Sequence, residues 1–242
     1  MKRIWLLMLL SGCGAAASGE DEEAIQGGAV DKKDPAVGLV WIKGGGFCSG
    51  SLVAPNVVLT AGHCVESKVA GFYTGEGDGA SDVGTLPVGG FVGHRVVEQA
   101  AHPSYRSENV CPNPTFDVAL LKLAKPIKTI APLAVATHAP TAGTVCRAVG
   151  YGVHDDNSGN VTVEQRRVAT ETVQSIHPTS IRVDRKSGLV DHGDSGGPLL
   201  CKGRIAGTTS CGNSEFPDAR DAYYGRVDSI ADWIDQTIAS WK

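Results

Sequence analysis

Seven cysteines in this 242-residue sequence restrict how it can fold. Cys13 stands near the N-terminus, and the other six lie at positions 48, 64, 111, 146, 201 and 211. In an exported chain, six cysteines without a Cys-x-x-Cys pair indicate three disulfides in preference to a zinc site. We therefore expect a disulfide-bonded domain and no metal.

The first residues carry an export signal. Lys2 and Arg3 precede an apolar run at 4–10, which is far shorter than the roughly 20 residues that span a bilayer. The segment Leu10-Ser11-Gly12-Cys13 resembles the bacterial lipoprotein box, in which the cysteine receives a diacylglycerol group. We expect Cys13 to anchor the chain to a membrane of the bacterial cell envelope. Ordinary signal-peptide cleavage near residues 15–17 is the alternative, and it would give a secreted protein.

The signal sets the boundaries of the remaining chain. Residues 1–13 form the signal segment, and residues 14–24 are small and acidic, which predicts a flexible tether. Residues 25–242 then form the folded domain. The formal net charge of -4 leaves no basic surface for nucleic acid, so DNA and RNA are not expected partners.

Composition and patterning favour an all-β domain. The chain has 31 glycines and only 6% aromatic residues, which is typical of short strands joined by tight turns. Strand patterns occur within 37–58 and at 91–97, 118–123, 144–149, 167–173, 180–183 and 204–208, whereas 71–90 and 154–160 are rich in turn residues. Apolar residues at 230, 233, 234, 238 and 241 share one helical face, which predicts a C-terminal helix over 229–241 capped by Asp228 or Ser229.

The most specific segment is Gly193-Asp194-Ser195-Gly196-Gly197-Pro198. A serine hydroxyl is a poor nucleophile at neutral pH, so catalysis requires a nearby base and donors for the oxyanion that forms on attack. Glycines on both sides of Ser195 allow a sharp turn that brings backbone N–H groups close to a substrate carbonyl. For this segment alone, a Gly-rich turn with an incidental serine is the alternative.

Two further segments supply the groups that such a serine needs. His63 follows the apolar run Val57-Val58-Leu59, where a strand ends and a loop begins, and unperturbed imidazole titrates near physiological pH. Asp117 stands at the start of an otherwise apolar strand, where a carboxylate is costly to bury without a hydrogen-bonding partner. An imidazole is such a partner.

Taken in order, the strings TAGHC, FDVALLKL and GDSGGP resemble the three catalytic blocks of the trypsin/chymotrypsin family. The resemblance implies two packed antiparallel β-barrels, about 25–127 and 135–227, with the active site between them. It implies a serine endopeptidase in which Ser195 is the nucleophile, His63 the general base and Asp117 the residue that orients the base, with hydrolysis through an acyl-enzyme. Protein or peptide substrates, no cofactor and a monomer are expected.

The same resemblance assigns the residues that bind the substrate. The backbone N–H groups of Gly193 and Ser195 would form the oxyanion hole, and the stretch Ser210-Cys211-Gly212 would pair with the substrate backbone. Leu189 falls at the base of the primary pocket, with Gly212 and Ala222 on its walls. An apolar side chain is therefore the expected preference, unless Asp191 or Asp221 points inward.

Activation by cleavage is a further implication. Ile25-Gln26-Gly27-Gly28 resembles the N-terminus that is freed in family zymogens, where the new ammonium inserts beside the aspartate that precedes the nucleophile. That residue is Asp194 here. Ala24 departs from the Arg or Lys that often precedes the cut, so a different activator is required.

Two cysteine pairs follow from the resemblance, namely Cys48 with Cys64 and Cys146 with Cys201. Cys111 and Cys211 remain by elimination, and a bond between them would tie the two barrels together across the cleft. Two free thiols are the alternative for this last pair.

The sequence leaves two points open. The acidic residues Glu76, Asp78 and Asp82 fit either a solvated loop or a calcium loop. An inactive, lipid-anchored binding module on the same fold is the rival to an enzyme.

Overall fold

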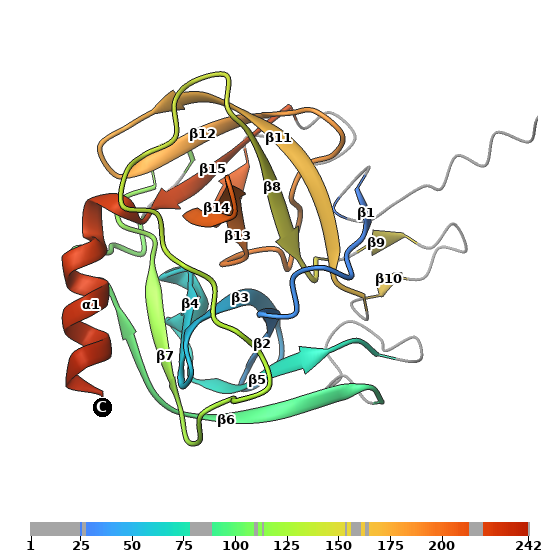
Figure 1. The fold of residues 1–242 in the computed structure, drawn as a ribbon, viewed down its shortest axis with the longest axis vertical. Helices are drawn as coiled ribbons and strands as arrows, with labels where there is room; N and C mark the ends of the chain where they lie inside the picture. Colours follow the sequence, from blue (N-terminus) through green and yellow to red (C-terminus); the bar gives the residue numbers. More distant parts are fainter. Residues whose placement is uncertain are drawn as a thin grey trace, which may run out of the picture.

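The computed structural model describes residues 25, 28–77, 89–108, 111–112, 114–152, 154–155, 161–162, 165–212 and 220–241. The signal segment with Cys13, the tether, Ala24 and the acidic residues Asp78 and Asp82 lie outside the described residues. Two six-stranded antiparallel β-barrels lie one against the other, and an α-helix packs at their side (Figure 1). The prediction of an all-β, two-barrel fold with a C-terminal helix is confirmed.

The first barrel closes around apolar side chains of its own. Its strands are β2 (Val37–Ile42), β3 (Phe47–Ala54), β4 (Val57–Thr60), β5 (Val69–Gly75), β6 (Phe91–Ala101) and β7 (Ala119–Leu123). They pair in the order β2-β3-β4-β7-β6-β5, and β5 returns to β2. Val40, Leu52, Phe72 and Leu121 are fully buried inside the barrel, so alternate residues of these strands form its core.

The second barrel has the same plan. Its strands are β8 (Val145–Gly150), β11 (Arg167–Ile176), β12 (Ser180–Arg185), β13 (Pro198–Cys201), β14 (Arg204–Gly212) and β15 (Asp221–Arg226). They pair in the order β11-β12-β15-β14-β13-β8, and β8 also pairs with β11. Strand β1 (Ala29–Val30) adds to β11, and β9 (His154–Asp155) pairs with β10 (Val161–Thr162). A separate apolar cluster spans both barrels and includes Val37, Leu39, Val118, Leu200 and Ile205.

Both regions that were expected to be rich in turns begin in a strand, since β9 covers His154–Asp155 at the start of 154–160 and β5 covers the start of 71–90. The turn-rich expectation for 71–90 was wrong at its beginning, because β5 extends from Val69 to Gly75. Two glycines hide the apolar pattern there, whereas hydrogen bonding to both β2 and β6 fixes the extended backbone. Phe72 from this strand is fully buried, so β5 contributes to the core as well as to barrel closure.

The C-terminal helix is shorter than expected and lacks the expected cap. Helix α1 (Ala231–Ser240) follows the 3-10 turn η2 (Asp228–Ile230), and no side chain caps its N-terminus. The Asp228 carboxylate instead accepts hydrogen bonds from Arg226 Nε at 2.7 Å and Nη2 at 2.8 Å. The ion pair with Arg226 therefore competes successfully with capping.

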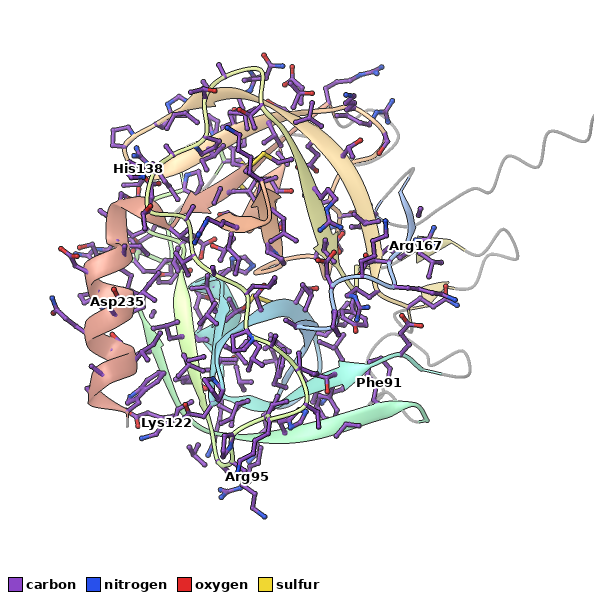
Figure 2. All side chains as sticks on the ribbon, in the orientation of Figure 1. Phe91, Arg95, Lys122, His138, Arg167 and Asp235 are labelled. Carbon is purple, nitrogen blue, oxygen red and sulfur yellow. A yellow bond between two sulfur atoms is a disulfide. The ribbon has the colours of Figure 1, made fainter. Side chains whose placement is uncertain are left out.

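Helix α1 packs on the barrels through one face. Ile234 is buried, whereas Asp235 points away from the barrels (Figure 2). Trp241 Nε1 donates a hydrogen bond of 2.7 Å to Glu98 Oε1 on β6, which holds the end of the helix to the first barrel. None of the helices in the described ranges is long and apolar enough to cross a membrane.

Three disulfides join the six expected partners. Cys48–Cys64 lies within the first barrel, and Cys146–Cys201 joins β8 to β13 in the second. Cys111–Cys211 connects the loop before β7 to β14, across 100 residues of sequence. This third bond is the disulfide that links the two barrels, and disulfides fit an extracellular protein.

Candidate active site

Strand pairing brings His63 and Asp117 together. Strand β4 ends at Thr60 and β7 begins at Ala119, and these two residues face each other in the antiparallel ladder. His63 lies just after β4, and Asp117 lies just before β7, so both reach the same end of the barrel. His63 Nδ1 is 2.8 Å from Asp117 Oδ2, and the backbone N–H of His63 donates to Oδ1 at 2.9 Å.

The second barrel completes the surroundings of Asp117, which is 3% exposed. Ser210 Oγ donates to Asp117 Oδ2 at 2.5 Å, and Thr208 Oγ1 donates to the Asp117 carbonyl at 3.0 Å. Burial would raise the pKa of the carboxyl, but hydrogen bonds from His63 and Ser210 outweigh it and lower the pKa on balance. Asp117 is therefore a carboxylate at neutral pH. This contact of Ser210 with Asp117 was not predicted from the sequence.

Asp117 also controls the protonation of His63. Burial alone would lower the pKa of the imidazole, whereas the hydrogen bond and negative charge of Asp117 raise it, and the net pKa is raised. The side chain of His63 is 32% exposed, so substrate can reach the ring. This arrangement suits a group that accepts a proton and then returns it.

Ser195 lies beside this pair, on the loop that leads into β13. Its carbonyl accepts a hydrogen bond of 2.7 Å from the Ser49 backbone N–H and lies 3.7 Å from Sγ of Cys64, the residue after His63. Within the described part of the chain, the Ser195 hydroxyl has no hydrogen-bond partner, so it is not bonded to His63 in this structure. Such bonds are often long before substrate binds.

The turn around Ser195 depends on two glycines. Gly193 has a φ of 92° and Gly196 a φ of 78°, which L side chains rarely adopt. A Cβ at Gly193 would collide with the ring of Phe47, and one at Gly196 would collide with Thr60 Oγ1. The backbone N–H groups of Gly193 and Ser195 have no acceptor among the described residues, so both remain available to a ligand.

Asp194 is a fully buried carboxyl. Its Oδ1 accepts the backbone N–H of Gly152 at 2.8 Å, and its Oδ2 accepts that of Asp191 at 3.0 Å. Burial raises the pKa of Asp194 to about 7, even though these hydrogen bonds lower it. Ile25 is also fully buried, but no hydrogen bond or ion pair joins it to Asp194 in the described structure.

The residues assigned to the primary pocket are mostly apolar. Leu189 is 2% exposed and Ala222 is fully buried, whereas Gly212 is exposed at the end of β14. Asp221 Oδ2 accepts a hydrogen bond of 2.8 Å from Arg182 Nε on β12. That ion pair accounts for Asp221 without a contact to substrate. Asp191 Oδ1 accepts the backbone N–H of His192 at 2.7 Å.

Glu171 is a buried acid that was not predicted from the sequence. It is fully buried, Tyr224 Oη donates to its Oε2 at 2.6 Å, and the Val190 backbone N–H donates to its Oε1 at 3.4 Å. Burial raises the pKa of Glu171 to about 8, so the carboxyl beneath residues 189–190 is mainly neutral at pH 7. The alternation of buried residues along β11 was the available signal, because it places Glu171 on the inward face.

One group of potential metal ligands lies at this site. The ligand atoms of Cys48, His63 and Cys64 lie within 4.8 Å of one another. Because the two cysteines form a disulfide, neither can provide a thiolate, and His63 is bonded to Asp117. These residues do not fit a metal centre.

Fold and site together define a two-barrel serine endopeptidase, in which a partly exposed histidine bonded to a buried aspartate lies beside the Gly-Asp-Ser-Gly turn. The family model for trypsin matches residues 25–234, so the chain belongs to the trypsin family. It is 28% identical to Trypsin-3 of Salmo salar over 93% of this chain and 98% of that protein. It is 29% identical to Trypsin II-P29 of Gallus gallus (98% and 99%) and 28% identical to Serine protease 1 of Rattus norvegicus (97% and 98%).

Proposed function

We propose that the protein hydrolyses peptide bonds with Ser195 as nucleophile, His63 as general base and Asp117 as the residue that orients His63. The observation that carries this proposal is the buried Asp117 carboxylate, which holds both the ring and the backbone of His63 next to the Ser195 turn. A monomer suffices, because one chain supplies all three residues.

The contact between His63 and Asp117 supports one direction of proton transfer. Asp117 occupies Nδ1 of His63, so Nε2 is the nitrogen that takes the proton when Ser195 Oγ attacks the carbonyl carbon. The N–H groups of Gly193 and Ser195 then stabilise the oxyanion. His63 returns its proton to the leaving amine, an ester on Ser195 remains, and water activated by His63 hydrolyses it. No step in this scheme uses a cofactor.

The substrate backbone has a defined place in this proposal. Strand β14 ends in Ser210-Cys211-Gly212, and the substrate would add to this stretch as an antiparallel strand. Cys211 is bonded to Cys111, so the loop before β7 is held beside the same stretch. We propose that this bond stiffens the subsites on the acyl side of the scissile bond and narrows the choice of substrate there.

A side-chain preference follows from the pocket residues. We expect amides with Leu, Phe or Ala before the scissile bond to be cleaved roughly 100-fold faster at pH 7 than those with Lys or Arg. The reason is that an ammonium beside Leu189 would be buried without a counter-charge, which costs a few kcal/mol. Values of kcat/KM on matched peptide amides measure the difference.

Glu171 provides the control for this prediction. Faster cleavage after Lys or Arg would contradict an apolar pocket. In that case the isosteric Glu171→Gln variant shows whether the buried carboxyl supplies the counter-charge. If the carboxyl does so, the variant loses the preference for Lys and Arg; if it does not, the variant keeps that preference.

We also propose that residues 1–13 export the chain to the bacterial cell envelope, that a lipid on Cys13 anchors it there, and that residues 14–24 tether the protease domain, 25–242. The sequence before Cys13 supports this, and the other six cysteines are paired with one another, which leaves Cys13 outside the disulfides. The multiply acylated lipoprotein terminus should hold more firmly than a single acyl chain.

A fluorophosphonate probe tests the proposed activity. Such probes form a covalent bond only with an activated serine, so the wild-type protein should be labelled and Ser195→Ala should not. Absence of labelling on every mature form would instead favour an inactive binding module. Labelling that persists in Ser195→Ala would show that another residue is the nucleophile.

A further inference from the structure

Ser49 connects the first barrel to the loop that carries Gly193. It lies on β3 and is fully buried. Its hydroxyl donates a hydrogen bond of 3.0 Å to the Gly193 carbonyl and accepts one of 2.9 Å from the Tyr151 backbone N–H. A hydroxyl provides one donor and two acceptor positions, so this side chain satisfies two backbone groups of the second barrel.

The backbone of Ser49 makes further bonds at the same place. Its N–H donates to the Ser195 carbonyl at 2.7 Å, and its carbonyl accepts Thr60 Oγ1 at 2.8 Å. Ser49 therefore holds the carbonyls on both sides of Asp194. Strand β3 in turn is fixed by its pairing with β2 and β4.

Gly193 needs an external restraint. Its φ of 92° is open to glycine only, and glycine has the widest freedom of backbone rotation. Packing against Phe47 excludes a side chain but does not hold the carbonyl in one direction. The hydrogen bond from Ser49 fixes the carbonyl side of the Gly193–Asp194 peptide group, whose N–H donates to the Asp191 carbonyl at 3.0 Å, so rotation of the group would break both bonds.

We propose that Ser49 is a positioning residue for the oxyanion hole: its hydroxyl holds the Gly193 carbonyl and so keeps the N–H groups of Gly193 and Ser195 directed at the substrate carbonyl. This inference rests on the proposed function. The hydrogen bond from the Tyr151 N–H to Ser49 supports this inference. The next residue, Gly152, donates to the carboxyl of Asp194, and Asp194 lies in the chain between Gly193 and Ser195, whose N–H groups form the oxyanion hole.

The Ser49→Ala variant tests the inference. We expect kcat to fall about 10-fold, because a buried hydrogen bond is lost and the donors spend less time in the productive orientation. KM for a peptide amide should stay within about 2-fold, since these donors bind the transition state more strongly than the ground state. Inhibition by a peptidyl trifluoromethyl ketone, whose adduct places an oxyanion in the hole, should weaken about 10-fold.

Ser51 is the matched control. It lies two residues further along β3 and is 1% exposed, and within the described structure its hydroxyl has no hydrogen-bond partner. Its side chain faces the same side of the strand as that of Ser49. Ser51→Ala removes one buried hydroxyl without breaking a hydrogen bond, so wild-type kcat and inhibition are expected.

The possible outcomes separate the two proposals. Ser49→Gly is a second variant that removes the same hydroxyl, and we expect the same loss of kcat. The test therefore does not depend on whether Ser49→Ala alone folds correctly. A lower Tm with unchanged kcat and unchanged inhibition in both Ser49 variants would overturn the inference and leave only a structural role. If fluorophosphonate fails to label the wild-type protein, the proposed function itself is wrong.

Discussion

Replacement of Asp117 by asparagine is expected to lower kcat by roughly 10⁴-fold and to leave the fold intact. Oδ1 of Asp117 accepts the backbone N–H of His63, so the amide nitrogen of asparagine would face His63 Nδ1. An amide nitrogen cannot accept a hydrogen bond from Nδ1–H. The imidazole would then carry its proton on Nε2, where it cannot act as a base toward Ser195.

The pH profile and a milder variant check this explanation. Asp117 raises the pKa of His63 above its ordinary value of 6.5, so kcat/KM should rise with pH as His63 loses its proton, and the midpoint should move to lower pH in Asp117→Asn. Ser210→Ala removes one donor to Oδ2 but keeps the acceptor, so about a 10-fold loss or less is expected. If Asp117→Asn keeps a tenth of wild-type activity, Asp117 does not orient the base.

The second large effect concerns the N-terminus at Ile25. A chain that begins at Ile25 should be roughly 10²- to 10⁴-fold more active than one that still carries residues 14–24. The free ammonium would pair with the buried Asp194 carboxyl. Burial raises the pKa of this carboxyl to about 7, because its hydrogen bonds do not fully offset the loss of solvation. Loss of one partner of a buried ion pair costs about 3–5 kcal/mol, which corresponds to this range.

A chain that begins at Ala24 is the matched control. One additional residue moves the ammonium by up to about 3.5 Å, beyond hydrogen-bond reach of a fixed carboxyl, so activity should stay low. Asp194→Asn should lower the activity of the Ile25 form to the same level. Equal activity of the Ile25 and Ala24 forms would exclude the ammonium as the activating group.

The same cut should release the protein from the membrane. All three disulfides lie within residues 48–211, so none connects the protease domain to Cys13. The uncut chain should therefore sediment with membranes and the Ile25 form should not. Cys13→Ala should make the uncut chain soluble without changing the activity of the Ile25 form. Mass spectrometry that finds an unmodified N-terminus beyond Cys13 in the uncut protein would contradict the anchor.

Sequence patterns predicted the elements that carry an apolar run or several β-branched residues of their own, such as β7 (ALLKL) and β11 (RVATETVQSI). They missed β5 and β15, in which glycine or polar residues interrupt the pattern, and β13, which has only four residues and begins with a proline; pairing with neighbouring strands fixes the extended backbone in all three. Strand β15 shows this, since Asp221 begins it while Ala222, Tyr223 and Tyr224 are buried between β12 and β14. Such strands depend on partners that are distant in sequence.

The candidate site divides in the same way. His63, Asp117 and Ser195 stand in short segments whose local chemistry is specific, so the sequence alone predicts them as site residues. Ser49 has no local signal, and the pattern of β11 places Glu171 on the inward face without indicating its partner, because both partners come from elsewhere in the fold. The hydroxyl of Ser49 meets a carbonyl 144 residues away, and Glu171 meets Tyr224 across 53 residues. Only the folded structure brings these residues into contact with their partners.

The bond between Cys111 and Cys211 also governs what a break in the chain does to the molecule. A cut at any peptide bond between these two cysteines opens a covalent ring but leaves both pieces joined, so Ser195, which lies inside the ring, stays attached to the piece that carries His63. A cut between residues 65 and 110 leaves no disulfide between the two pieces, because Cys48–Cys64 closes only the segment before it. A cut in the second barrel between these cysteines therefore keeps His63 and Ser195 in one covalent molecule, whereas a single cut between residues 65 and 110 leaves the base and the nucleophile on two pieces that only non-covalent contacts hold together.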